Sequence, residues 1–289
     1  MSSAAAPDVS SIPNFSYLPS MLEVVALHVY PVKSMGGVSV PSFRMTDRGP
    51  EHDRRFMLVD ETGRFLSQRE HPSMALFKTS IAGAQLEVRH ASDPDRRVML
   101  ALRPESGEER RVQVWDDECV AWRVSEQADG WFSGILGREC MLVYMPDHSL
   151  RPVDPDYALD SEVTSFSDGY PVLIIGESSL ADLNGRLSVP VGMDRFRPNI
   201  VFRGGEPFSE DGFRRIRIGG LEFFGVKPCA RCVVTTIDQS TAVAGKEPLA
   251  TLSTYRSRGN KVNFGMNLLH RGQGVVRVGD TIRLLEKRG

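Results

Sequence analysis

Apolar and polar residues alternate over most of this chain, with the period expected of β-strands that have one buried face. Strands are predicted in the following segments: residues 23–34, 84–90, 96–102, 110–115, 118–124, 170–176, 197–202, 262–269 and 275–286. Two further stretches, residues 54–68 and residues 213–226, have the pattern of β-hairpins, turning at Asp60–Gly63 and at Gly219–Gly220. This spacing of strands suits antiparallel sheets or barrels.

Three segments have a helical pattern instead. Residues 125–136 combine an apolar face with Ser125 at the start, a residue type that caps helices. The other two helices are expected at residues 177–187 and residues 246–256. The predicted fold class is therefore mixed α/β but β-rich, with short helices.

A stretch rich in proline and acidic residues, residues 145–162, interrupts the pattern in the manner of a linker or long surface loop. It divides the chain into two β-rich domains, predicted at residues 21–145 and residues 146–289. Residues 1–20 are rich in Ser, Ala and Pro, and we expect a disordered tail there. This tail lacks the basic residues of a secretory signal or a mitochondrial presequence.

Composition narrows the classes of function. Hydrophobic residues make up 41% and charged residues 25% of the 289 positions, which suits a folded globular chain of one or two domains. A net charge of −2 without a basic block argues against nucleic acid as a partner. No apolar run approaches the about 20 residues that a bilayer crossing needs, so no membrane partner is expected either. Four cysteines do not make a disulfide scaffold, and we expect a reducing, cytoplasmic location.

Two of the four cysteines, Cys229 and Cys232, form a C-x-x-C pair. A structural zinc site would need two more ligands nearby, but Cys119 and Cys140 stand apart from the pair. An iron–sulfur cluster would need four grouped cysteines. A thioredoxin-type disulfide would need a helix after the pair, whereas the β-branched run at residues 232–237 predicts a strand.

Cations lie next to the same pair. Lys227 precedes it and Arg231 lies between the two thiols. Nearby positive charge favours the thiolate, which is the form of cysteine that binds metals. The residues by themselves therefore indicate a reactive or metal-binding cysteine, and two inert buried thiols remain the alternative.

Several segments in order along the chain resemble the family that joins a MOSC N-terminal β-barrel domain to a MOSC domain, named for the molybdenum cofactor sulfurase C-terminus. These segments are "YPVKSMGG", "DRRFMLVDETGRFLSQR", "FRPNIV", "PCARCVVTTIDQSTAVAGKEPLATLSTYR", "NFGMNLL" and "VRVGD". The resemblance covers about residues 22–286 and is nearest to bacterial YcbX-like proteins and the mitochondrial amidoxime-reducing component. It implies an N-terminal β-barrel-like domain followed by a C-terminal MOSC β-barrel domain.

The resemblance also implies a cofactor. Proteins of this family bind molybdenum on the dithiolene of a pyranopterin (molybdopterin), and one protein cysteine completes the sulfur ligands. This role falls on Cys232, as metal ligand and catalytic residue, and leaves Cys229 as a neighbour. A soft thiolate suits a metal that is already held by sulfur.

The residues implied to bind the cofactor are Lys33, Ser34, Arg54, Asp168, Gly169, Tyr170, Arg197, Asn199, Arg231 and Asn267. Lysine, arginine and serine suit the pterin phosphate as charge-assisted donors. In "DRRF", Arg54 and not Arg55 matches the family motif. Gly169 and Tyr170 replace small hydroxyl residues of the mitochondrial relatives, so contacts there would use backbone groups.

The function that the resemblance implies is a two-electron reduction of small N-hydroxylated compounds, such as amidoximes, to amidines or amines. The chain shows no ferredoxin domain of the kind that YcbX-like proteins often carry, so electrons are expected from a separate protein: a ferredoxin, a flavin reductase or a cytochrome b5-like protein. No residue of the matched motifs is an evident proton donor. The alternative is a module that carries or delivers molybdopterin or its sulfur without turnover.

Overall fold

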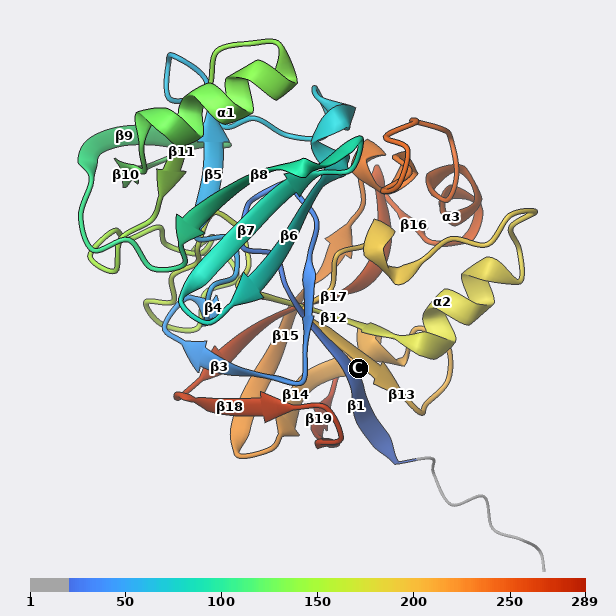
Figure 1. Ribbon diagram of the computed structural model, residues 1–289. Coiled ribbons are helices and arrows are strands. Elements are labelled where there is room, and N and C mark those ends of the chain that lie inside the picture. The colour runs from blue at the N-terminus through green and yellow to red at the C-terminus, as the bar shows by residue number, and fades with distance from the viewer. Residues whose placement is uncertain (1–20) are drawn as a thin grey trace, which may run out of the picture.

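The computed structural model describes residues 21–289, which form a β-rich fold with three α-helices among them (Figure 1). The predicted tail, residues 1–20, lies outside the described residues. The helices are α1 (Glu126–Leu136), α2 (Glu177–Asn184) and α3 (Leu249–Tyr255), in the three segments predicted to be helical. Ser125 caps α1 as expected, since its side chain accepts a hydrogen bond from the amide of Ala128 at 3.1 Å. None of these helices is long and apolar enough to cross a membrane.

Seven strands close into a barrel. In spatial order they are β12 (Val172–Gly176), β13 (Ile200–Arg203), β1 (Leu22–Val29), β19 (Thr281–Lys287), β14 (Phe213–Ile218), β15 (Leu221–Ala230) and β17 (Lys261–Arg271). The barrel closes because β17 also pairs with β12. Apolar side chains such as Leu27, Ile174 and Phe223 are fully or almost fully buried in its core. Two short strands, β2 (Val38–Val40) and β16 (Ser257–Arg258), extend it at β1 and β17.

One barrel strand comes from the beginning of the chain. β1 pairs with β13 on one side, where Leu27 lies opposite Ile200, and with β19 on the other. The two halves of the sequence therefore share one barrel, joined through β1. The domain boundary near residue 146 stays a prediction, because no observation tests it.

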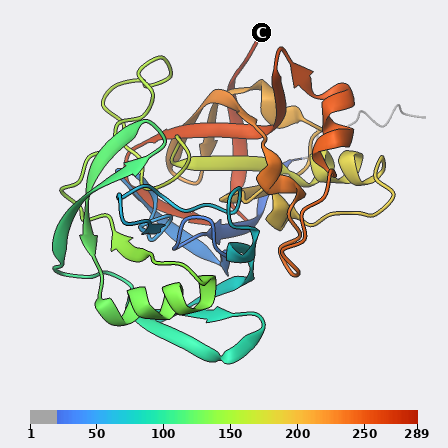
Figure 2. The same ribbon diagram turned by 90° about the horizontal axis from the view of Figure 1, so that it is seen from above.

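Three smaller sheets complete the structure. They are β5 (Phe56–Val59), β11 (Met141–Tyr144), β10 (Asp117–Arg123) and β9 (Glu108–Val114); β6 (Phe77–Ala82), β7 (Gln85–His90) and β8 (Asp93–Ala101); and β18 (Gly274–Arg277), β3 (Ser42–Thr46) and β4 (Gly49–Pro50). Four 3-10 helices are present among the described residues: η1 (Pro72–Leu76), η2 (Met193–Arg195), η3 (Ser209–Gly212) and η4 (Val233–Thr236). Seen from above, α1 lies on one side of the molecule and α2 and α3 lie on the other (Figure 2).

The expected strand at residues 232–237 is wrong. Cys232 is instead the residue before η4, a single 3-10 turn. The hydroxyl groups of Thr235 and Thr236 donate hydrogen bonds to the carbonyls of Cys232 and Val233, three residues earlier, at 3.0 and 2.8 Å. Such local bonds compete with strand pairing, and here they stabilise the turn despite the β-branched residues.

The two predicted hairpins have different outcomes. β14 and β15 form the hairpin predicted for residues 213–226, with Gly219 at φ +56° in its turn. At residues 54–68, by contrast, β5 ends at Val59 and the return arm pairs with it only through an isolated bridge to Phe65.

Candidate functional site

Most of the predicted site residues lie where barrel strands begin or end. Lys33 follows β1, Asp168 precedes β12, and Arg197 and Asn199 precede β13. β1 is antiparallel to β13, whereas β12 is parallel to β13. The end of β1 and the starts of β12 and β13 therefore lie at the same edge of the barrel. Cys232, which follows β15, reaches the same region through its neighbour Arg231.

Arg54 joins this edge from the turn before β5. Its Nη1 donates to Asn199 Oδ1 at 3.3 Å and its Nη2 donates to the carbonyl of Arg197 at 3.2 Å. Asn199 is 1% exposed and is held by the amide of Leu173 and the carbonyl of His28, both at 3.2 Å. Residues 145 positions apart in sequence are thus joined by side-chain hydrogen bonds.

Positive charge is concentrated here. The guanidinium groups of Arg54 and Arg197 both lie against the ring of Tyr30, 4.3 and 4.2 Å from its centroid. Arg54 also pairs with the buried carboxylate of Asp53 at 2.6 Å. Burial and the charge of Arg54 lower the pKa of Arg197 to about 10, although the charges of Asp168 and Asp53 oppose the shift. An anion at this position would be stabilised by both guanidinium groups.

Lys33 lies in a cage of rings. Its side chain is 4% exposed, and its ammonium lies 5.1 Å from the centroid of Phe65 and 5.9 Å from that of Trp115 and donates to Asp168 at 2.6 Å. Burial lowers the pKa of Lys33 to about 8, although Asp168 opposes the shift. Partial desolvation raises the pKa of Asp168, but the charges of Lys33, Arg69 and Arg54 outweigh it and hold that pKa below its usual range.

The thiol of Cys232 is partly exposed and accepts a hydrogen bond from Arg69 Nη2 at 3.3 Å. Arg69 lies over the ring of Trp115, 4.1 Å from its centroid. Arg231 donates through Nε to the carbonyl of Phe264 at 2.8 Å and through Nη1 to that of Phe196 at 3.0 Å. Its Nη2 is buried and has no hydrogen-bond partner in the structure. An unpaired buried donor is costly, so this nitrogen is available to a ligand.

Cys229 has a less favourable setting for a thiolate. Burial raises the pKa of its thiol, with the charge of Arg231 opposing the shift. Both cysteines are free. No three His, Cys, Asp or Glu side chains among residues 21–289 converge in a way that would hold a metal by themselves.

The remaining predicted residues lie around these groups with fewer direct contacts. Ser34 accepts a hydrogen bond through its carbonyl from Gln68 at 2.9 Å. Gly169 has no heavy atom within 4 Å of the position of a Cβ, so its backbone faces open space. Tyr170 has a buried hydroxyl without a partner, and burial raises its pKa. Asn267 lies in β17, opposite Leu173 of β12 and Lys227 of β15.

Backbone strain also marks the site. Seven residues other than glycine among those described have a positive φ angle, and three of them are predicted site residues: Ser34 at 64°, Arg54 at 48° and Arg197 at 56°. Such conformations are unfavourable for residues with a Cβ, and they concentrate at functional sites. Such conformations persist only where the surrounding structure holds them, so the three residues are held in place by their neighbours.

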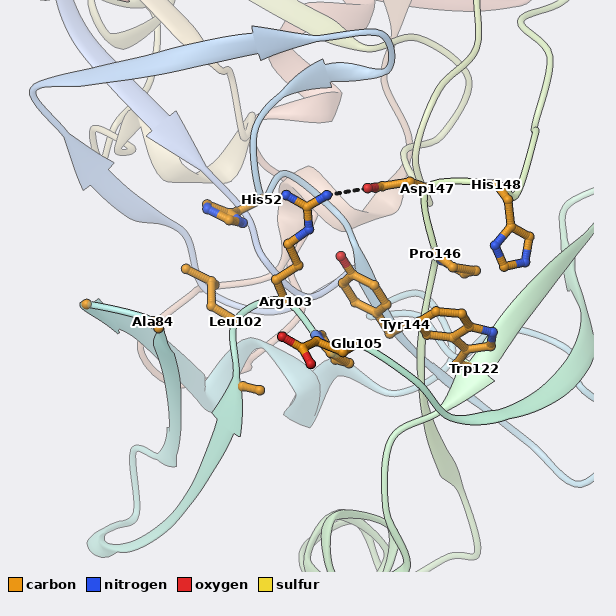
Figure 3. A pocket seen from close by; sticks show the side chains of 13 residues that line it. His52, Ala84, Leu102, Arg103, Glu105, Trp122, Tyr144, Pro146, Asp147 and His148 are labelled. Carbon is orange, nitrogen blue, oxygen red and sulfur yellow. Dashed lines mark hydrogen bonds and ion pairs between the residues drawn. The ribbon is translucent and has the colours of Figure 1, made fainter.

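Arg55, the neighbour of Arg54, points to a different region. It donates to the carbonyl of Met145 and to Asp147 Oδ1, the latter at 2.8 Å. Asp147 also pairs with Arg103 at the wall of a pocket of about 1310 Å³ (Figure 3). The pocket is also lined by His52, Leu102, Glu105, Trp122, Tyr144 and His148. None of the predicted site residues lines this pocket.

Sequence reasoning missed several residues of the site. They are Tyr30, Asp53, Gln68, Arg69 and Trp115. Asp53 and Arg69 lie inside segments that carry the family resemblance, at the start of "DRRF" and the end of "FLSQR", which is a usable signal. The sequence around Trp115 contains no such signal, because Trp115 contributes to the site only where the fold places its ring near Lys33.

The site as a whole carries surplus positive charge. Its cations are Lys33, Arg54, Arg69, Arg197 and Arg231. Its carboxylates are Asp53 and Asp168. These residues suit a ligand that carries both an anionic group and a metal that binds thiolate. The cations would neutralise the anionic group, and the thiol of Cys232 lies next to the cations.

Comparisons with known proteins identify the family of this chain. Models of the MOSC N-terminal beta barrel domain and of the MOSC domain match residues 21–139 and residues 161–283. Mitochondrial amidoxime-reducing component 1 of Homo sapiens is 32% identical over 281 residues, covering 91% of this chain and 82% of that protein. Mitochondrial amidoxime reducing component 2 of Rattus norvegicus is 31% identical, covering 88% and 80%. Molybdenum cofactor sulfurase of Oryza sativa subsp. japonica is 32% identical over 86% of this chain but only 32% of its own length.

Proposed function

Because this chain belongs to the family that joins a MOSC N-terminal β-barrel domain to a MOSC domain, we propose that its site binds the molybdenum cofactor and reduces N-hydroxylated compounds. The free cysteine Cys232, whose sulfur accepts a hydrogen bond from Arg69 beside a surplus of cations, supports this function most directly. That combination offers a soft ligand for a sulfur-bound metal and a place for a phosphate.

Each residue has a distinct part in holding the cofactor. Cys232 is the ligand of the metal, and Arg231 offers its unpaired Nη2 to the pterin. Lys33, Arg54 and Arg197 neutralise the phosphate, each in a position fixed by the contacts described above. Tyr30 and Asn199 do not contact the reacting atoms; they orient the two arginines.

The bound cofactor supplies a two-electron reduction, in which R–NHOH with two electrons and two protons gives R–NH2 and water. The protein contributes orientation and charge around that reaction. We propose that the electrons come from a separate redox protein, since the relatives that this chain matches over most of their own length are named reducing components and the four cysteines of this sequence are not spaced as a cluster site.

The test uses protein purified from a host that makes the molybdenum cofactor. With a chemical reductant and benzamidoxime, the proposed enzyme forms benzamidine, and Cys232→Ala does not. A protein that contains molybdenum and pterin yet forms no benzamidine is a carrier and not a reductase.

A further inference from the structure

Two glutamines join the halves of the candidate site. Gln68 and Gln239 are 0% and 8% exposed, although both are polar. Gln68 Nε2 donates to Gln239 Oε1 at 3.2 Å, and Gln239 Nε2 donates to Gln68 Oε1 at 3.0 Å. This reciprocal amide pair connects positions 171 residues apart. Buried side-chain amides are retained only where their donors and acceptors find partners, and this pair satisfies both.

Each amide of the pair also binds backbone of the site. Gln68 Nε2 donates to the carbonyl of Ser34 at 2.9 Å, in the turn that carries Lys33. Gln239 Nε2 donates to the carbonyl of Ile237 at 3.0 Å, in the segment that follows Cys232. The pair therefore connects the Lys33–Ser34 turn with the segment after the thiol.

The next residue in the chain makes a second connection. Arg69 donates to the sulfur of Cys232 and lies on the ring of Trp115, which also faces Lys33. Two consecutive side chains thus reach from one loop of the N-terminal half to the thiol and to the segment that follows it. A lysine could not take over both contacts of Arg69, because only a planar guanidinium can stack on the ring of Trp115 and donate to the sulfur of Cys232 at the same time.

We propose that Gln68 and Arg69 are positioning residues that hold the Cys232 segment at a fixed separation from the Lys33–Ser34 turn. The inference rests on the proposed function, because it takes these two elements as the metal ligand and the phosphate anchor of one cofactor. A cofactor held at both ends binds tightly only when its two anchor points have the right separation before binding. Neither residue needs to touch the pterin.

The test compares full-length Gln68→Ala and Gln239→Ala with the wild type, and Gln85→Ala is the control because Gln85 is exposed in β7. The first readout is the rate at which pterin leaves the purified holoprotein. Loss of the pair shortens the half-time about tenfold, the effect of one to two hydrogen bonds. The second readout is backbone hydrogen exchange in cofactor-free protein, which rises at Thr235 and Ile237 in both variants.

Combining the variants tests the pair itself. Because the two amides bind each other, Gln68→Ala with Gln239→Ala releases pterin about as fast as Gln68→Ala alone. Arg69→Lys keeps the charge and loses the stacking geometry, so it also releases pterin faster than the wild type. Wild-type retention in Gln68→Ala and Gln239→Ala overturns the inference and leaves the proposed function standing. A wild type without pterin overturns the proposed function, and the hydrogen exchange of the cofactor-free protein then tests the inference by itself. Exchange at Thr235 and Ile237 that is unchanged in Gln68→Ala and Gln239→Ala overturns the inference as well. Raised exchange at these two positions upholds the positioning role.

Discussion

Lys33 and Asp168 form an ion pair at 2.6 Å between a lysine that is 4% exposed and an aspartate that is 73% exposed. The pair joins the turn after β1 to the loop before β12. Because burial holds the pKa of Lys33 at about 8, this site changes charge close to physiological pH. The pH dependence of ligand binding follows from that shift.

Cofactor affinity should fall as the pH rises above about 8, by about tenfold per unit while Lys33 loses its proton. The sign follows from the charge, since only protonated Lys33 attracts an anionic phosphate.

The stability of the folded chain has the opposite pH trend. Between about pH 8 and pH 10.5 the Lys33 side chain holds a proton in the unfolded chain that it lacks in the folded chain. The contribution of Lys33 to the free energy of unfolding therefore rises with pH over that window. Pterin retention and chemical denaturation as functions of pH measure the two trends separately. Lys33→Arg stays charged, and an identical retention profile in this variant would rule out Lys33 as the titrating group.

Arg54→Ala should lower molybdopterin content, because Arg54 is proposed to bind the pterin phosphate. Each charge-assisted hydrogen bond to a phosphate contributes about 1.5–3 kcal/mol, or about one to two decades of affinity. Arg64→Ala is the control, because Arg64 is 57% exposed and pairs with Glu70 at the surface. Arg55→Ala is less suitable, since Arg55 bonds to Met145 and Asp147 in the interior. Equal pterin content in Arg54→Ala and Arg64→Ala would remove Arg54 from the phosphate site.

Cys232→Ala should abolish reductase activity and molybdenum retention, while Cys229→Ala keeps a substantial part of both. The difference arises because Arg69 donates a hydrogen bond to the sulfur of Cys232 at 3.3 Å, whereas burial raises the pKa of the Cys229 thiol and so disfavours the thiolate that would bind a metal. Metal analysis of the two purified variants measures it. Equal loss of metal in both would indicate a site built from two cysteines.

A fragment of residues 150–289 should not fold stably. It lacks β1, whose Val24, Leu27 and Val29 are at most 2% exposed in the barrel core. Burying each such side chain contributes about 1.5–3 kcal/mol, and the three together are comparable with the about 5–15 kcal/mol that stabilises a whole domain. Circular dichroism during heating tests this prediction. A cooperative transition like that of the full chain would show that the barrel closes without β1.

The sequence predicted the strands and helices well where the local pattern was strong. Ser125 before an apolar face predicted α1, and Gly219–Gly220 between two alternating runs predicted the β14–β15 hairpin. It failed at residues 232–237, because the hydroxyls of Thr235 and Thr236 bond to nearby carbonyls, and propensity scales do not capture that local competition.

The site could be predicted only through family resemblance. Alternation and spacing left the cysteine pair open between several chemistries, and nothing local distinguished Arg54 from Arg55. The structure separates these two arginines, since Arg54 turns to Asn199 and Arg55 to Asp147. Gln68 and Arg69 were missed because their partners, Gln239 and Cys232, lie more than 160 residues away in sequence.

The proposed function depends on the binding of a molybdenum–pterin cofactor through Cys232. The most direct measurement is quantitative analysis of metal and pterin in wild-type protein purified from a host that makes the cofactor, with Cys232→Ala prepared in parallel. We predict equimolar molybdenum, pterin and wild-type chain, and loss of molybdenum in the variant. Wild-type protein without pterin, or with zinc in place of molybdenum, would contradict the claim.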